Sequence, residues 1–267
     1  MRRLALSLAA LAAVALALGA WVWSGLPSRA EVRALALRTP GRTRLMQERE
    51  EEARSRGRAG HSRQTPVPLA GVSRHLIHAV LASEDQRFFG HEGVDWTALQ
   101  ESLQKDVEKR RFVRGGSTIT QQLAKNLYFG TAKTPLRKLR ELVVARWLEQ
   151  DLSKPRILSL YLNVIEWGDG VYGCEEAARR WYGKPAAALS EREAAGLAAM
   201  IPNPRRLNPA TSPARHERAT RRVLWLMAKA GYLGRDTAPL GAEPPPEEVP
   251  EEGEPEGAEP APDPSRP

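Results

Sequence analysis

Two adjacent carboxylates, Glu84 and Asp85, end an apolar stretch and precede the aromatic pair Phe88 and Phe89. A carboxyl group beside apolar and aromatic side chains is poorly solvated, which raises its pKa toward the range of a useful general base. His91 follows and has two interpretations, a structural hydrogen bond or direct proton transfer. Because a solvated helix end would show the same pattern, this segment predicts a base only together with other groups.

Residues 114–126 combine glycine, hydroxyl and amide groups ahead of a lysine. The two glycines allow close approach of a ligand, and Ser117 and Thr118 stand at a predicted helix start, where free N–H groups favour an anion. Lys125 adds a positive charge about two turns later. The Gly-Lys-Ser/Thr ending of a nucleotide-binding loop is missing, so a nucleoside triphosphate is not indicated. A capped helix alone would explain Ser117, but not the density of polar groups before Lys125.

A third group, Arg137, Lys138 and Glu141, has the spacing of neighbours on one helix face. One interpretation is a surface ladder of ion pairs, each contributing about 0.2–0.5 kcal/mol. The other is a cationic clamp for an anion, in which the carboxylate holds the cations in position or binds a divalent ion.

The elements that must position these groups are predicted to be helices, because helix caps recur and strand alternation is almost absent. Ser73 precedes an amphipathic run that ends near Glu84, and Thr134-Pro135 opens a helix that reaches about Leu152. Further helix starts are predicted at Ser153-Lys154-Pro155, Ser190 with Glu193, and Ser212-Pro213. The fold class is therefore all-α.

Residues Leu4–Trp23 are apolar apart from Ser7, close to the ~20 residues that cross a bilayer. Arg2 and Arg3 before them predict a cytoplasmic N-terminus and an exported body. A cleaved signal peptide is the alternative, but the apolar run is longer than a typical one of roughly 7–15 residues.

The 267 residues carry a formal net charge of +8, and their one cysteine, Cys174, excludes an intramolecular disulfide. We predict four parts: a cytoplasmic start and transmembrane anchor at 1–25, a charged juxtamembrane linker at 26–65, a helical domain at 66–234, and a disordered Pro/Glu-rich tail at 235–267. The basic body suits an anionic partner.

The three motifs together resemble the peptidoglycan glycosyltransferases of glycosyltransferase family 51, in the monofunctional form without a transpeptidase domain. The resemblance runs from about Pro66 to Met227 and includes later signatures, namely Ile157–Asn163, Gly168–Gly173, Ala177-Ala178, Tyr182–Lys184 and Pro202–Pro204. It implies a lysozyme-like, two-lobed helical domain at 66–234. One departure is Ser159, where the family usually has Glu.

The resemblance implies that Glu84 is the catalytic base, with Asp85 beside it, and that Glu141 is a second essential carboxylate and a candidate ligand of an assisting divalent cation, Mg or Mn. No tightly bound cofactor is implied. The implied substrate-binding residues are Arg114, Ser117, Thr118, Gln121, Lys125, Asn126, Arg137 and Lys138.

The implied reaction polymerises glycan strands from lipid II, with inversion, at the outer face of the cytoplasmic (inner) membrane. Expected partners are lipid II, the growing glycan chain, the membrane and other cell-wall synthases. Nucleic acid is not expected, because the body is exported and no binding motif is present. Two alternatives remain: a lysozyme-like hydrolase or lytic transglycosylase, and a non-catalytic membrane scaffold of wall synthesis.

Overall fold

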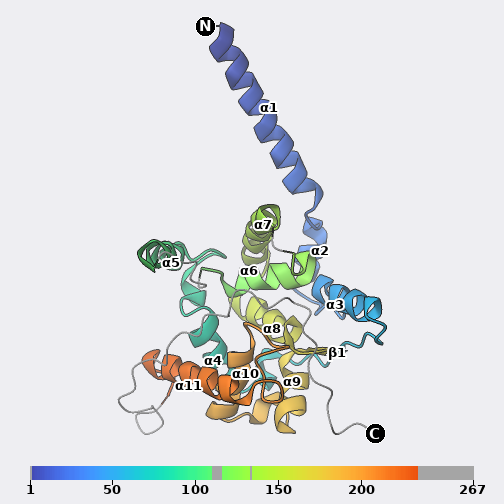
Figure 1. Ribbon diagram of the computed structural model, residues 1–267, viewed down its shortest axis with the longest axis vertical. Helices are drawn as coiled ribbons and strands as arrows, with labels where there is room; N and C mark the ends of the chain where they lie inside the picture. The colour runs from blue at the N-terminus through green and yellow to red at the C-terminus, as the bar shows by residue number, and fades with distance from the viewer. Residues whose placement is uncertain (1, 110–115, 133, 234–267) are drawn as a thin grey trace.

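The computed structural model describes residues 2–109, 116–132 and 134–233, and most of them are helical, so the predicted all-α class is confirmed. Helix α1 (Arg2–Ser24) projects from the body as a single rod (Figure 1). Its window Leu6–Trp23 has a mean hydropathy of 2.1 and is entirely unburied. By length and composition, α1 is able to cross a membrane.

The segment predicted as a charged linker contains two helices, α2 (Arg29–Ala34) and α3 (Arg44–Ser55). Ser28 begins α2 with a capping box, and the Thr43 side chain caps α3. Val32 joins the main hydrophobic core, and Met46 packs with the buried Tyr172. Both helices therefore belong to the folded body, since each buries apolar side chains against it.

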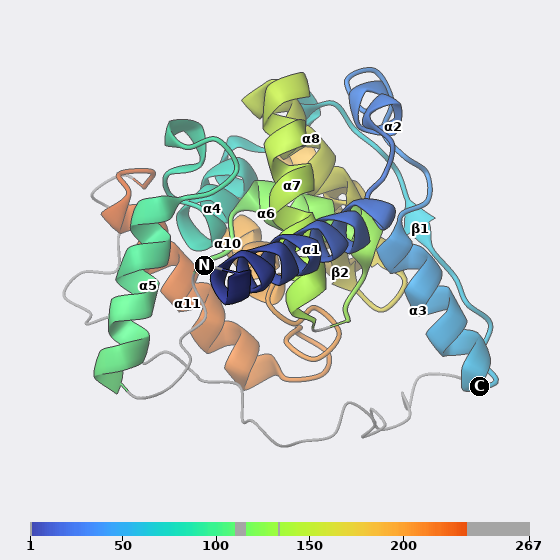
Figure 2. The same ribbon diagram turned by 90° about the horizontal axis from the view of Figure 1, so that it is seen from above.

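The helices of the body form two layers along the direction of α1 (Figure 1). Among the helices that follow α3, those on the side toward α1 are α5 (Trp96–Lys109), α6 (Ile119–Ala124) and α7 (Pro135–Asp151). Farther away lie α4 (Arg74–Glu84), α8 (Lys154–Val164), α9 (Cys174–Tyr182), α10 (Glu191–Met200) and α11 (Pro213–Lys229). Seen from above, α1 passes over α6 and α7 (Figure 2).

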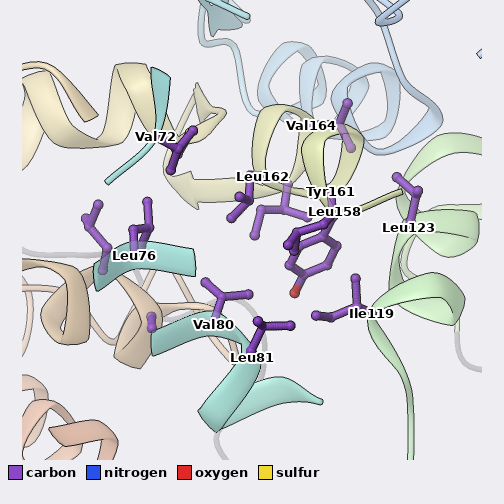
Figure 3. Packing of buried hydrophobic residues seen from close by; sticks show 14 of the residues in the cluster. Val72, Leu76, Val80, Leu81, Ile119, Leu123, Leu158, Tyr161, Leu162 and Val164 are labelled. Carbon is purple, nitrogen blue, oxygen red and sulfur yellow. The ribbon is translucent and has the colours of Figure 1, made fainter. Parts of the chain in front are cut away.

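The core joins both layers (Figure 3). Val80 and Leu81 of α4 face Ile119 and Leu123 of α6, and the Tyr161 ring of α8 lies between them. All five side chains are at most 4% exposed. This packing fixes the end of α4 against the start of α6, where the first two sequence motifs lie.

The predicted helix starts agree with the structure. The side chains of Ser73, Thr134, Ser153 and Ser190 cap α4, α7, α8 and α10, and Ser190 forms the predicted capping box with Glu193. Pro213 opens α11 as expected, although the Ser212 side chain makes no capping hydrogen bond.

A small three-stranded sheet was not predicted. Strand β3 (Val171–Tyr172) pairs in parallel with β1 (Arg63–Gln64) and antiparallel with β2 (Glu166–Gly168). Gly170 has φ +70° in the turn that joins β2 to β3, a conformation that favours glycine. The described residues also form 3₁₀ turns at Leu69–Gly71, Phe88–Gly90 and Ala186–Ala188, and a π-helical turn at Lys125–Phe129.

Candidate active site

Glu84 is the last residue of α4, and its side chain is half-buried. Burial raises the pKa of Glu84 above its usual value; a hydrogen bond from Gln122 and the charge of Lys125 oppose this rise, and the charge of Asp85 adds to it. Poor solvation thus makes Glu84 a stronger proton acceptor than an exposed glutamate, as the sequence predicted.

Two uncharged side chains hold the Glu84 carboxylate in place. Gln122 Nε2 donates to Glu84 Oε2 over 2.7 Å, and the Tyr161 hydroxyl donates to Gln122 Oε1 over 2.9 Å. Tyr161 is fully buried, and burial raises its pKa well above the usual value, so it remains a neutral donor. The chain from Tyr161 through Gln122 therefore orients Glu84 from the core.

Asp85 lies in a different environment from Glu84. Its carboxylate accepts the backbone N–H of Ile119 at the start of α6 over 3.0 Å, and both oxygens lie 3.0 Å from His91 Nε2. Gly93 N–H donates to His91 Nδ1, which leaves the imidazole proton on Nε2 to face Asp85. Asp85 and His91 thus join α4 to α6, and the structural interpretation of His91 is the one that its contacts support.

The start of α6 is fixed by hydroxyl and amide groups of the second motif. Thr118 accepts the Gln121 N–H as the helix cap, and its hydroxyl donates to Gly93 O over 2.7 Å. Gln121 Nε2 donates to the same carbonyl, while its Oε1 accepts from Lys138 Nζ over 2.9 Å. The exposed Ser117 hydroxyl accepts from Lys138 Nζ as well. The second and third motifs therefore meet through Lys138.

The third motif lies on α7, as its spacing predicted. Glu141 is 3% exposed; it accepts a hydrogen bond from Arg137 and lies 3.4 Å from Lys138 Nζ. One buried carboxylate thus positions two cations, which keep part of their surface exposed. Because the carboxylate is buried, this arrangement is not an exposed ladder of ion pairs. That the two cations bind an anion stays a prediction.

Lys125 connects the two sides of the site. Burial lowers the pKa of Lys125, Glu141 and Glu84 raise it, and Arg137 and Lys138 lower it. Lys125 therefore lies within the electrostatic reach of both Glu84 and the α7 cations. Among the residues that the structure describes, its ammonium group has no hydrogen-bond or ion-pair partner. A partly desolvated, unpaired cation is suited to binding an anion.

The remaining predicted residues have separate outcomes. Asn126 follows Lys125 and is buried. Ser159 is buried in α8, where its carbonyl accepts from Asn163 Nδ2 over 2.7 Å. Arg114 lies outside the described residues.

Sequence reasoning missed Gln122 and Tyr161. It selected Gln121, yet consecutive residues of a helix point about 100° apart, and Gln121 contacts Lys138 whereas Gln122 contacts Glu84. The three-residue spacing between Gln122 and Lys125, which places both on one helix face, was the available signal.

The carboxylates that could bind a metal ion already serve other groups. Glu141 is engaged by Arg137 and Lys138. Asp85, His91 and Asp95 have ligand atoms within 4.8 Å of one another, but Asp95 accepts from Arg87 over 2.8 Å and from Ala98 N–H. A divalent ion would compete with a fixed positive charge at either place, so neither set fits a tightly bound metal as arranged.

Comparison with known proteins places these residues in a family. The family described as "Transglycosylase" matches residues 50–228. The chain is 48% identical to the Biosynthetic peptidoglycan transglycosylase of Dechloromonas aromatica over 166 residues, which are 62% of this chain and 72% of that protein. It is 44% identical to proteins of the same name from Nitrosospira multiformis, covering 72% and 83% of the two chains, and from an Azoarcus species, covering 81% and 94%.

Proposed function

Because this chain belongs to the transglycosylase family and is thus a peptidoglycan glycosyltransferase, we propose that it polymerises glycan strands from lipid II by an inverting transfer. The growing chain, held on a polyprenyl pyrophosphate, is the donor. The 4-hydroxyl of the next lipid-linked disaccharide is the acceptor, and the product is a β-1,4 bond.

One observation carries this proposal: Lys125 lies within electrostatic reach both of Glu84, whose pKa is raised by burial, and of the cations on α7. A sugar hydroxyl is a weak nucleophile and needs a positioned base. A pyrophosphate leaving group needs charge stabilisation more than it needs a proton. The two sides of the site match these two needs.

In the proposed step, Glu84 accepts the proton of the acceptor 4-hydroxyl. At the same time the oxygen of that hydroxyl forms a bond to the anomeric carbon of the donor. The bond from that carbon to the pyrophosphate oxygen breaks on the opposite face, and the electron pair leaves with the pyrophosphate. A single displacement of this kind inverts the anomeric configuration. Lys125, Arg137 and Lys138 stabilise the departing charge, and Glu141 holds the last two in position.

Thr118, Gln121 and Asp85 support this site indirectly in the proposal. Each contacts the start of α6 or the side chain of Lys138, so each fixes the distance between the base and the cations. For Ser117, which is exposed, and for Asn126, which is buried, contact with the donor phosphates stays a prediction of the family resemblance.

The donor carries a membrane-soluble tail, and α1 is long and apolar enough to cross a bilayer. We therefore place α1 in the cytoplasmic membrane with the body on the outer face, following the two arginines before the span. Tethering the enzyme in the membrane of its substrate raises their effective concentration.

The test separates polymerisation from hydrolysis. Purified full-length protein is incubated with labelled lipid II in vesicles, and in parallel with finished, labelled glycan strands. We expect incorporation of label into polymer and no shortening of finished strands. Shortening of strands without incorporation would instead support a lysozyme-like hydrolase or lytic transglycosylase. If neither incorporation nor shortening is observed, the result would support the non-catalytic membrane scaffold.

A further inference from the structure

Helix α1 is joined to the body by a set of contacts that the proposed reaction does not use. Arg140 of α7 donates from Nη2 to Trp21 O over 2.6 Å and from Nε to Val22 O over 3.1 Å. These carbonyls belong to the last turn of α1, where the helix dipole favours a positive charge. Trp21 O also accepts from the Ser24 hydroxyl, and Val22 O also accepts from the Gly25 N–H. Arg140 therefore caps the C-terminus of the apolar helix from the catalytic body.

Gly25 makes this cap possible. A Cβ atom built on Gly25 would lie 2.1 Å from the Arg140 guanidinium carbon, so any side chain at this position displaces the guanidinium. The group that must move is the end of a flexible side chain rather than backbone. Replacing Gly25 by Ala thus removes the cap without unfolding α7.

Aromatic and charged contacts extend the junction along α7. Trp23 packs edge-on against Trp147, with ring centroids 5.9 Å apart, and the Arg29 guanidinium lies 5.4 Å from the centre of the Trp147 ring. Arg29 also forms a two-pronged ion pair with Asp151, at 2.6 and 3.1 Å. A half-open pocket of about 440 Å³ lies at the junction and is lined by Trp23, Leu26, Pro27, Ser28, Arg29 and Trp147.

Arg140 and Trp147 are seven residues apart, and Trp147 and Asp151 are four apart. These three contact residues therefore share one face of α7. Glu141 and Arg137, which belong to the candidate site, lie on the adjoining face of α7. The single helix α7 thus carries the cations on one face and contacts the end of the apolar helix with the next. Figure 1 shows α7 beside the end of α1 that joins the body.

We infer that Arg140, Gly25 and the Trp23–Trp147 pair form a docking junction that fixes the height of the catalytic site above the bilayer. This inference rests on the proposed function, because it assumes that α1 spans the membrane and that the donor is anchored there. Arg140 and Trp147 are positioning residues. Through α7 they set the position of the site's cations relative to the donor pyrophosphate.

The first test compares two donors. Lipid II in vesicles requires the correct height, whereas a water-soluble donor with a short lipid chain reaches the site from solution. For Arg140→Ala and Gly25→Ala we expect kcat/KM to fall roughly tenfold with the vesicle donor, since small misplacements are costly, and to stay unchanged with the soluble donor. Trp147→Ala should behave similarly, and Trp147→Phe should recover activity because it keeps the aromatic contact.

The chain offers matched controls. Gly19→Ala lies in α1 with no atom within 4 Å of the added Cβ. Arg146→Ala removes an exposed arginine of α7 that pairs with the exposed Glu92. Both should retain wild-type rates with both donors. Equal loss with the two donors, or no loss in Arg140→Ala, would overturn the inference.

A second measurement does not depend on activity. A spin label on Thr97→Cys, at the exposed start of α5, reports its depth relative to the bilayer. The native Cys174 is fully buried and burial raises its pKa to about 12, so it should not react with the label. We expect Arg140→Ala to change the depth and Arg146→Ala to leave it unchanged. An unchanged depth in Arg140→Ala contradicts the docking junction, even if the wild type made no polymer and the proposed function had failed.

Discussion

At the scale of single residues, neighbouring carboxylates have different environments. Glu84 accepts one hydrogen bond from a neutral amide and keeps part of its surface exposed. Asp85 is buried and accepts from a backbone N–H and from His91. The first arrangement leaves a carboxylate able to accept a proton from a substrate, and the second uses the carboxylate to hold two elements together.

Gln122 should set the pH dependence of the reaction. A base works only when deprotonated, so activity falls as the pH drops through the pKa of Glu84. The Gln122 hydrogen bond lowers that pKa, so Gln122→Ala should move the acidic limb of the kcat/KM profile to higher pH. Gln86→Ala is the control, because Gln86 donates to Ala82 O instead. An acidic limb that stays in place would argue against Glu84 as the base.

Asp85 should have the opposite effect on the same limb. Its charge raises the pKa of Glu84, so Asp85→Asn should move the limb to lower pH. The substitution also weakens charged hydrogen bonds to Ile119 N–H and His91, which should cost about 1–3 kcal/mol of unfolding free energy. Denaturant unfolding and a pH–rate profile measure the two effects. Unchanged stability would show that Asp85 does not hold α4 to α6.

The sequence motifs identified the residues that bear charge, because Glu, Lys and Arg at helical spacing are recognisable in one dimension. They did not identify Gln122 and Tyr161, which become partners only when α6 and α8 pack together. The spacing of Gln122 and Lys125 places both on one helix face, but only the packing of α4, α6 and α8 shows that the amide of Gln122 contacts Glu84.

At the scale of elements, helix starts were predictable because a cap and the helix that it begins are adjacent in the chain. The three-stranded sheet was not, since its strands have two or three residues, too few for alternation to be visible, and β1 is remote from β2 and β3 in sequence. Residues 26–65 looked like a linker because their many charges conceal a few buried contacts, such as those of Val32 and Met46.

Helix α3 should depend on a buried ion pair. Arg49 Nε lies 3.2 Å from Glu166 Oε2, and Glu166 is 6% exposed with its other oxygen unpaired. Removing one partner of a buried pair costs about 3–5 kcal/mol, and we expect the lower end for Arg49→Ala because Arg205 also faces Glu166. Arg44→Ala, which breaks a more exposed pair with Glu51, should change stability by less than about 0.5 kcal/mol.

The pH dependence of this effect has a defined sign. Burial raises the pKa of Glu166, and loss of Arg49 should raise it further, so the ionised form becomes more costly in the folded state. Thermal unfolding should therefore show the largest loss in Arg49→Ala at neutral pH. The loss should shrink as the pH falls toward the ordinary pKa of glutamate; an equal loss at all pH values would exclude this cause.

At the scale of the whole molecule, an apolar helix stands on a basic catalytic body, and α7 contacts both the helix and the candidate site. The cations of α7 lie in the layer nearer α1, and Glu84 faces this layer from the end of α4. This arrangement is suited to the lipid-linked donor of the proposed function, whose pyrophosphate would lie at the bilayer surface. The apolar helix and the charged residues of the candidate site were each recognisable in the sequence. Their connection through Arg140 was not, because it joins residues more than a hundred positions apart.

The orientation of the chain gives a direct prediction at this scale. The exposed Thr97→Cys should react with a membrane-impermeant maleimide in intact spheroplasts, since the body is proposed to lie outside. A cysteine added ahead of Met1 should react only after the membrane is permeabilised. The reverse pattern would place the body in the cytoplasm. That result would contradict the proposed polymerisation of lipid II at the outer face of the membrane.

The Glu84→Gln protein tests the central claim most directly, because the substitution removes the proton acceptor and keeps the size of the side chain. Its rate of lipid II polymerisation is measured in vesicles beside the wild type, with thermal unfolding of both. We predict a rate at least roughly a hundredfold lower at an unchanged unfolding temperature. A Glu84→Gln protein that polymerises lipid II at the wild-type rate would contradict the assignment of Glu84 as the base.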